Sequence, residues 1–187
     1  MDFITKTKIT ADINKLQQDL KSLLHTHDWP KEDFDLKMPG NQISVTHRPG
    51  EDIWTDGTGN LYDPVKEEFF ATEADFTEFN PYLGSYTKEM LLELAKQEGF
   101  KLGRVRYMRL EPKKGLSIHK DFDDRYHFVI ETNKNALFGE VFDDSDVRAS
   151  CYHLPADGCA YRVDTTREHF VYNGGWEDRI HLVINKA

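Results

Sequence analysis

Histidine, aspartate and arginine gather in one stretch of the chain, residues 115–130. Alternate side chains of a β-strand point to the same face, so His119 and Asp121 share a face, and Arg125 and His127 share a face further along. An imidazole and a carboxylate at this spacing can bind a metal ion. A guanidinium and an imidazole at the same spacing can bind an anion. The stretch therefore predicts a chemical site.

A second stretch, residues 166–185, reads as a strand, an Asn-Gly-Gly turn and another strand, which predicts a hairpin. Arg167 and His169 share one face of its first strand, and Arg179 and His181 share one face of its second. Four strand segments thus repeat a polar face of His, Asp and Arg backed by an apolar face. Strands that are polar inside and apolar outside suit a barrel or jelly roll whose interior is a site.

After residue 101 the chain reads as eight short strands separated by turn sequences. The predicted strands are Arg104–Leu110, Leu116–Asp121, Arg125–Glu131, Ala136–Phe142, Val147–His153, Gly158–Val163, Glu168–Tyr172 and Arg179–Asn185. Eight short strands of this kind predict a double-stranded β-helix, the jelly-roll or cupin-like barrel. The fold class expected is mainly β with flanking helices.

The first hundred residues are expected to be rich in helix. Residues 10–25 carry leucines at helical spacing behind a possible cap, Thr10. A second helix is expected between Thr87, as its cap, and Gly99, where it ends. Residues 42–48 alternate like a strand.

Residues 51–85 show no clear period, and a loop of this length suggests a lid or a substrate-binding segment. Unrecognised short strands or a helix are the alternative. We find no linker composition or internal repeat, so one domain is expected over residues 1–187. It would combine a helical and lid part, 1–100, with a jelly-roll core, 101–187.

Composition limits the function classes. The 187 residues carry a net charge of −9 without a basic stripe, which argues against a nucleic-acid partner. No apolar run approaches the roughly 20 residues that span a bilayer. The N-terminus lacks the apolar core of a secretion signal, so a cytoplasmic location is expected. Cys151 and Cys159 are too few for a disulfide framework.

Two histidines and one carboxylate on one face of a metal ion leave three coordination positions open, as in non-haem Fe(II) oxygenases. His119 and Asp121 would supply two ligands from one strand end, and a strand of the late hairpin can bring a third across the barrel. His169 is the best third ligand, because Arg179 on the next strand can then bind the far carboxylate of a 2-oxoacid that chelates the metal.

From about Arg104 to Asn185 the sequence resembles the aspartyl/asparaginyl β-hydroxylase family of Fe(II)- and 2-oxoglutarate-dependent oxygenases. The motifs that carry the likeness are Arg106-Tyr107, His119-x-Asp121, Arg125-x-His127, Arg167-Glu-His169-x-Val-x-Asn173 and Asp178-Arg179-x-His181-Leu182.

The resemblance implies that His119, Asp121 and His169 bind iron. It also implies that Arg179 holds the distal carboxylate of 2-oxoglutarate, with His127 and Arg125 assisting at this cosubstrate. Dioxygen would convert 2-oxoglutarate to succinate and carbon dioxide while a C–H bond is hydroxylated. The animal members that hydroxylate peptides lack the carboxylate ligand, whereas bacterial members acting on free amino acids retain it.

The retained carboxylate of Asp121 and the compact size favour a free amino acid or similar small molecule as substrate, with Thr46 and Arg48 as candidate contacts. An aspartyl or asparaginyl residue in a peptide is the alternative substrate. A cupin-like module that binds metal or ligand without oxidation is the alternative from another class. The oligomeric state stays open.

Overall fold

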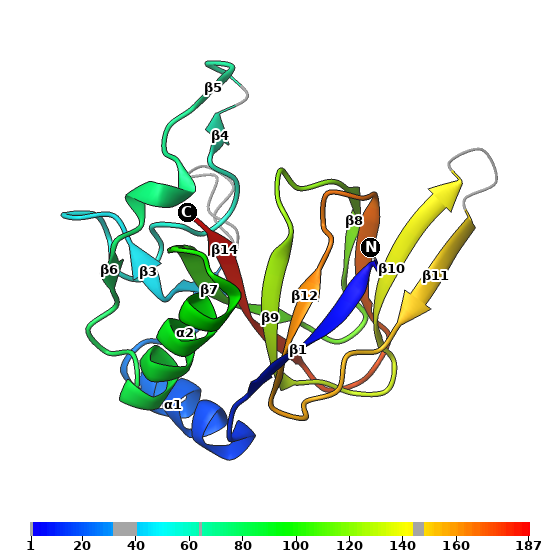
Figure 1. Cartoon of the computed structure of the whole chain (residues 1–187), viewed down its shortest axis with the longest axis horizontal. Helices are drawn as coiled ribbons and strands as arrows, with labels where there is room; N and C mark the ends of the chain where they lie inside the picture. The colour runs from blue at the N-terminus through cyan, green and yellow to red at the C-terminus, as the bar shows by residue number, and fades with distance from the viewer. Residues whose placement is uncertain (1, 32–40, 64, 144–147) are drawn as a thin grey trace. The chain divides into compact units, whose positions relative to one another are not determined.

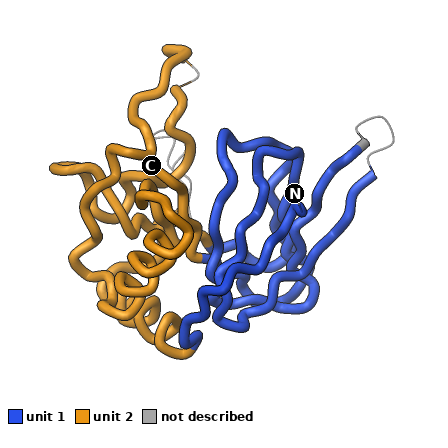
Figure 2. The backbone as a smooth tube through the Cα atoms, viewed as in Figure 1, with its two compact units in different colours: residues 1–13, 109–181 blue, residues 14–108, 182–187 orange. Residues whose placement is uncertain are grey.

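The structure is a computed structural model that describes residues 2–31, 41–63, 65–143 and 148–187 (Figure 1). The chain divides into two compact units (Figure 2). The first unit consists of residues 1–13 and 109–181, and the second consists of residues 14–108 and 182–187. The expectation of one domain, with its core after residue 100, stays a prediction.

The first unit is built from antiparallel strands in two sheets. One sheet has the strand order β11-β10-β13-β8, and the other runs β1-β12-β9 and continues into β14. The strands are β1 (Ile4–Thr10), β8 (Gly115–His119), β9 (Arg125–Glu131), β10 (Ala136–Asp143), β11 (Arg148–Tyr152), β12 (Cys159–Val163), β13 (His169–Asn173) and β14 (Arg179–Lys186). Strand β10 pairs with β11, β9 with β12 and β8 with β13. Such nested pairs, shared between two sheets, are the arrangement of a jelly roll.

The predicted jelly roll is confirmed strand by strand. Each of the eight segments expected after residue 101 overlaps one of the strands β7 to β14. Val147, the expected start of the fifth segment, lies outside the described residues. These strands were predictable because alternate side chains of a strand point to opposite faces, which differ here in chemistry.

The interior of the first unit combines apolar and polar side chains. Phe138 and Val171 from one sheet pack in a buried cluster with Val129 and Val163 from the other. Strand β9 is buried on both faces, since Tyr126, Phe128 and Ile130 alternate with His127 and Val129. His127, His169, Arg179 and His181 are also buried, so the interior that holds the apolar cluster also holds titratable groups.

The second unit contains both α-helices and a set of short strands. The helices are α1 (Ile13–Thr26) and α2 (Ser85–Glu98), with a 3₁₀ turn η1 (Glu73–Asp75). The strands are β2 (Gln42–Ser44), β3 (Thr46–His47), β4 (Tyr62–Asp63), β5 (Glu68–Phe69), β6 (Glu78–Phe79) and β7 (Leu102–Leu110). Strand β7 lies between β2 and β14, and β3–β6 and β4–β5 form two further pairs.

The two helices have the spacing expected from their sequence. Leu16, Leu20 and Leu23 are the buried residues of α1. Helix α2 ends at Gly99, whose φ of 74° is left-handed and suits a residue without a side chain. Its N-terminus is capped by another helix, because the Thr87 N–H and hydroxyl both donate to Asp19 Oδ2, at 2.8 and 2.9 Å.

The expectation of a helix-rich N-terminal part is wrong. In the described part of residues 1–100, two helices of 14 residues each accompany six strands, β1 to β6. Thr10 is the last residue of β1, and α1 begins at Ile13. Strands β2 and β3 lie within residues 42–48, where a strand was expected, whereas β1 depends on its partner β12 far along the chain, so a local pattern does not reveal it.

Residues 51–85 contain β4, β5, η1 and β6, which matches the alternative of unrecognised short strands. A role as a lid stays a prediction. Neither helix in the described ranges is long and apolar enough to cross a membrane.

Candidate metal centre

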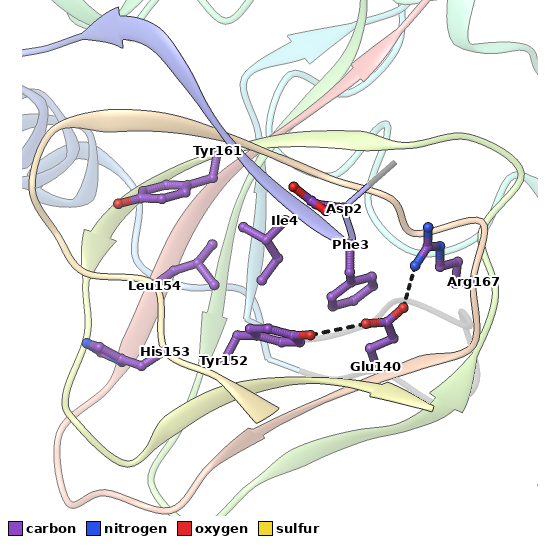
Figure 3. Close-up of a pocket in the computed structure, with 9 residues that line it drawn as sticks. All are labelled: Asp2, Phe3, Ile4, Glu140, Tyr152, His153, Leu154, Tyr161 and Arg167. Carbon is purple, nitrogen blue, oxygen red and sulfur yellow. Dashed lines mark hydrogen bonds and ion pairs between the residues drawn. The ribbon is translucent and has the colours of Figure 1, made fainter. Parts of the chain in front are cut away.

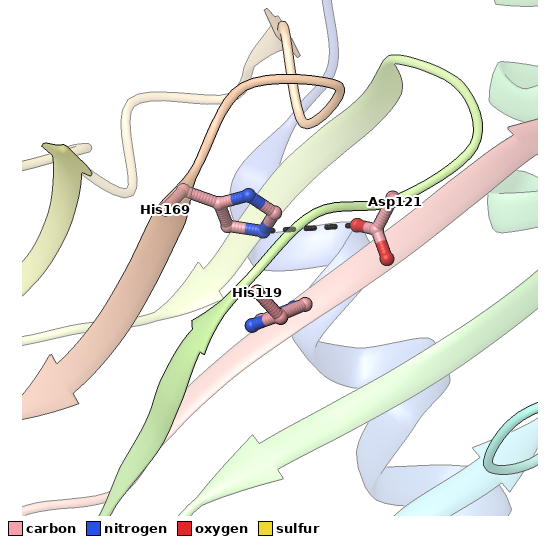
Figure 4. Close-up of side chains that lie close together, drawn as sticks. All are labelled: His119, Asp121 and His169. Atoms are coloured by element: carbon pink, nitrogen blue, oxygen red, sulfur yellow. Dashed lines mark ion pairs between the residues drawn. The ribbon is translucent and has the colours of Figure 1, made fainter. Parts of the chain in front are cut away.

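Three predicted site residues of the first unit lie together. His119 is the last residue of β8 and His169 the first of β13, and the two are register partners in that pair. Partners in a sheet share a face, and the two ring centroids are 4.3 Å apart. Asp121 follows two residues after β8, and its backbone N–H donates to the Thr165 carbonyl at 2.8 Å. One ligand atom from each of His119, Asp121 and His169 lies within 4.8 Å of the others (Figure 4).

Both imidazole rings are held in the tautomer that a metal ligand needs. His119 Nδ1 lies 2.7 Å from the Ser117 carbonyl oxygen, and His169 Nδ1 lies 2.9 Å from the Arg167 carbonyl oxygen. A carbonyl oxygen only accepts, so Nδ1 carries the proton in each ring. The lone pair then resides on Nε2, and the backbone contact fixes the orientation of the ring.

The carboxylate of Asp121 completes a set of donors that fits a divalent transition-metal ion. Asp121 Oδ2 is buried without a hydrogen-bond partner and lies 3.7 Å from His169 Nε2. Asp121 Oδ1 accepts from Arg125 Nη2 at 2.6 Å. An orphaned carboxylate oxygen beside two imidazole nitrogens is costly unless a cation binds there. Two imidazoles and a carboxylate are the ligands of a facial Fe(II) site.

Burial keeps His169 ready to bind a metal. Burial of the ring lowers the pKa of His169, and the hydrogen bond to the Arg167 carbonyl raises it by a smaller amount. The ring is therefore neutral near pH 7, and a neutral imidazole is the form that ligates metal ions.

A buried cation lies deeper in the same unit. Arg179, only 6% exposed, packs its guanidinium 5.0 Å from the centre of the Phe138 ring, and its Nη2 donates to His181 Nδ1 at 3.1 Å. No carboxylate in the described part of the chain forms an ion pair with it. Burial lowers the pKa of Arg179 to about 9. An uncompensated buried guanidinium suits an anionic ligand.

Two histidines lie next to this guanidinium, with His181 in contact with Arg179 and His127 in contact with His181. His181 Nδ1 lies 3.4 Å from His127 Nδ1, and His181 Nε2 is buried without a hydrogen-bond partner. Burial, and then the nearby charge of Arg179, lower the pKa of His181 well below its usual range. His181 is therefore neutral, and Arg179 carries the positive charge of the cluster.

The remaining predicted site residues contact other groups of the protein. Arg125 contacts Asp121, a predicted metal ligand. In the second unit, the Thr46 hydroxyl donates to the Gly103 carbonyl at 2.9 Å and accepts from the Val105 N–H at 2.7 Å. The guanidinium of Arg48 pairs with Asp56, with Nη2 and Oδ1 2.7 Å apart. Substrate contacts by Thr46 and Arg48, and cosubstrate contacts by Arg125 and His127, stay predictions.

A cavity of about 480 Å³ lies in the first unit (Figure 3). Its lining residues are Asp2, Phe3, Ile4, Glu140, Tyr152, His153, Leu154, Tyr161 and Arg167. Glu140 is the register partner of His169, so both side chains lie on one face of the sheet. The Phe3 ring lies 5.7 Å from the Tyr152 ring and 6.5 Å from the His169 ring, centre to centre. The cavity therefore lies on the face of the sheet that carries His169.

Sequence reasoning missed two aromatic side chains at this site. Phe138 lies under Arg179, and its position on the inner face of the strand predicted at 136–142 was a usable signal. Phe3 had no such signal, because it precedes a strand that was not predicted.

Comparisons with known proteins give a fold and a family. Streptomyces viridochromogenes AviO1 superposes with a TM-score of 0.58, at 12% identity over 100% of this chain and 90% of that chain. A Pseudomonas putida prolyl-4-hydroxylase gives 0.50, at 9% identity over 98% and 91%. IDO from Bacillus thuringiensis gives 0.51, at 8% identity over 100% and 90%. At such identities these likenesses show the fold alone. No curated protein matches the sequence.

The family model described as aspartyl/asparaginyl beta-hydroxylase matches residues 10–186. The match extends well beyond residues 104–185, where the resemblance was visible in the sequence. It covers nearly the whole chain, and the chain therefore belongs to the aspartyl/asparaginyl β-hydroxylase family of 2-oxoglutarate- and Fe(II)-dependent oxygenases and is an enzyme of the hydroxylase class.

Proposed function

We propose that this enzyme hydroxylates an unactivated C–H bond of a free amino acid or an amino-acid-like molecule. In this proposal His119, Asp121 and His169 hold Fe(II), and 2-oxoglutarate and dioxygen are the co-reactants. The grouping of these three side chains, with both imidazoles fixed for ligation through Nε2, is the observation that carries the proposal.

Iron, when bound, supplies the oxidising chemistry, in which dioxygen oxidises 2-oxoglutarate to succinate and carbon dioxide while one oxygen atom enters the substrate C–H bond. The chain supplies the geometry. The Ser117 and Arg167 carbonyl oxygens fix the rings of His119 and His169, so neither ring has to reorient when the metal arrives.

Arg179 is assigned to the distal carboxylate of 2-oxoglutarate. Its buried charge has no carboxylate partner in the described residues, and a dicarboxylate would neutralise it in a low-dielectric interior. His181 donates no proton to Arg179, because its Nδ1 accepts from the guanidinium. The neutral imidazole thus orients the guanidinium without adding a second positive charge.

A small substrate is favoured by the cavity of the first unit. About 480 Å³ is within the range of roughly 300–1,000 Å³ typical of small-molecule sites. The cavity combines aromatic walls with the carboxylates of Asp2 and Glu140 and the guanidinium of Arg167, which pairs with Glu140, and this mixture suits a molecule with an apolar body and charged groups. A free amino acid has both features.

The first test is an anaerobic titration with Fe(II) and then 2-oxoglutarate, followed by the weak visible charge-transfer band of the chelate. We expect the band in the wild type and in His25→Ala, which changes an exposed histidine of α1. The band should be lost in Asp121→Ala and His169→Ala. A folded wild-type protein that binds Fe(II) but gives no band would contradict the oxygenase site and favour a cupin-like module without oxidative chemistry.

The second test measures succinate release with a panel of free amino acids and with short peptides containing Asp or Asn. Stimulation by a free amino acid, lost in Glu140→Gln, is the expected result. Stimulation by peptides alone would show that the substrate class is wrong while the oxygenase assignment holds.

A further inference from the structure

The two oxygens of the Asp121 carboxylate have different surroundings. Oδ1 accepts a charge-assisted hydrogen bond from Arg125 Nη2 at 2.6 Å. Oδ2 is buried without a hydrogen-bond partner and lies 3.7 Å from His169 Nε2. Both side chains are largely shielded from water, at 11% exposure for Asp121 and 17% for Arg125. One oxygen is therefore occupied by the protein, and the other is directed towards the imidazole.

Backbone contacts hold both members of this ion pair in place. The Asp121 N–H donates to the Thr165 carbonyl at 2.8 Å, and the Thr165 hydroxyl donates to the Asp123 carbonyl at 2.6 Å. Arg125 begins β9 and is the register partner of Val163 on β12. Both ends of the 121–125 turn are thus tied to one short segment, so the contact between the two side chains is fixed by the fold.

We propose that Arg125 is a positioning residue that makes Asp121 a ligand through one oxygen only. This inference rests on the proposed function. A carboxylate can bind a metal through one or both oxygens. An oxygen that accepts a short hydrogen bond from a guanidinium is a poorer donor to a cation, and the guanidinium also blocks approach from its side. Arg125 therefore leaves Oδ2 as the ligand atom.

The number of open coordination positions follows from this choice. Two imidazoles and a one-oxygen carboxylate leave three positions of an octahedral ion open. A 2-oxoacid that chelates through two atoms would fill two of them, and the third would remain for dioxygen. A carboxylate bound through both oxygens would take one of the three, so chelation and dioxygen binding would compete. The sequence suggested that Arg125 contacts the cosubstrate, whereas its contact with Asp121 acts before any cosubstrate binds.

The test uses Mn(II) as the probe, in the full chain and without 2-oxoglutarate. Water-proton relaxation at several fields counts the exchangeable waters on the bound ion. We expect about three waters in the wild type and about two in Arg125→Met, because the released carboxylate then binds through both oxygens. Arg125→Lys keeps a cationic donor and should retain about three. Arg162→Met is the matched control, since Arg162 pairs with Asp124 and not with a proposed ligand.

The possible outcomes separate this inference from the proposed function. A count of about three waters in a folded Arg125→Met protein, with weaker 2-oxoglutarate binding, would assign Arg125 to the cosubstrate and overturn the inference alone. A wild type that does not bind Mn(II), or whose binding survives Asp121→Ala and His169→Ala, would overturn both. If Arg125→Met does not fold by circular dichroism, Arg125→Leu removes the hydrogen-bond donor with a different apolar side chain, and the same loss of one water is expected.

Discussion

Replacing Arg179 by methionine should stabilise the ligand-free protein while abolishing its affinity for 2-oxoglutarate. The guanidinium is buried without a carboxylate partner among the described residues, so its charge is a cost to folding that only an anionic ligand offsets. A methionine of similar length fills the space without that charge. Function and stability thus make opposite demands on this side chain.

The size of the effect follows from the local environment. Burial lowers the pKa of Arg179 from its usual, much higher range to about 9, and each tenfold change in proton affinity is worth about 1.4 kcal/mol. The charge therefore opposes folding by roughly 5 kcal/mol at every pH below about 9, and the penalty is relieved only as the pH rises through that value. The hydrogen bond to His181 and the contact with the Phe138 ring each offset about 1 kcal/mol of this penalty. We expect a net gain of about 1–4 kcal/mol in the variant.

Urea unfolding with metal chelator, followed by tryptophan fluorescence at pH 7, measures this gain. Adding 2-oxoglutarate at about a hundred times its dissociation constant to the Mn(II)-loaded protein should stabilise the wild type by about 3 kcal/mol, whereas Arg179→Met should gain nothing beyond the effect of Mn(II) alone. A ligand-free variant less stable than the wild type would refute the reasoning, because it would mean that the protein already compensates the charge.

Three further predictions concern the packing of the fold. Because burial lowers the pKa of His181, the unfolded chain binds a proton at low pH that the folded chain does not, so the free energy of unfolding should fall below about pH 6.5 by up to about 1.4 kcal/mol per pH unit. Urea unfolding between pH 5 and 7 should show that the unfolding free energy of His181→Gln depends less on pH than that of the wild type. His25→Gln, which changes an exposed histidine, is the control and should keep the wild-type pH dependence. Asp19→Ala should lower the free energy of unfolding by about 1 kcal/mol, since it removes the cap of α2. Gly84→Ala should lower it by a similar amount, because a Cβ there would lie 1.9 Å from the Asp19 carboxyl carbon and displace the cap. The two losses should not add in the double variant, and additive losses would contradict this reasoning. Gly158→Ala should lower the unfolding free energy by more than about 2 kcal/mol, because its φ is 78° and a Cβ would lie 2.1 Å from the Ala11 carbonyl oxygen; a wild-type thermal midpoint would contradict it.

The strands of the jelly roll were predictable because their signal is local. A strand of this kind carries its own alternation of polar and apolar residues, as β14 does with Arg179 and His181 against Ile180 and Leu182. In the N-terminal part, the alternation over residues 42–48 predicted the segment of β2 and β3, but β4, β5 and β6 have only two residues each, too few for such a pattern. Strand β1 is long enough, but its residues between Ile4 and Thr10 are mostly exposed and depend on pairing with β12 for their conformation.

The sequence alone determined which side chains of each strand face the interior, and hence that His119, Asp121, His169 and Arg179 could form one site. It did so because alternation is a property of each strand by itself. Only the tertiary structure decided how the strands pair across the chain, which brings His169 opposite His119. It also decided that Arg125 holds one oxygen of Asp121, because a contact between side chains depends on the path of the intervening turn and not on spacing in the sequence.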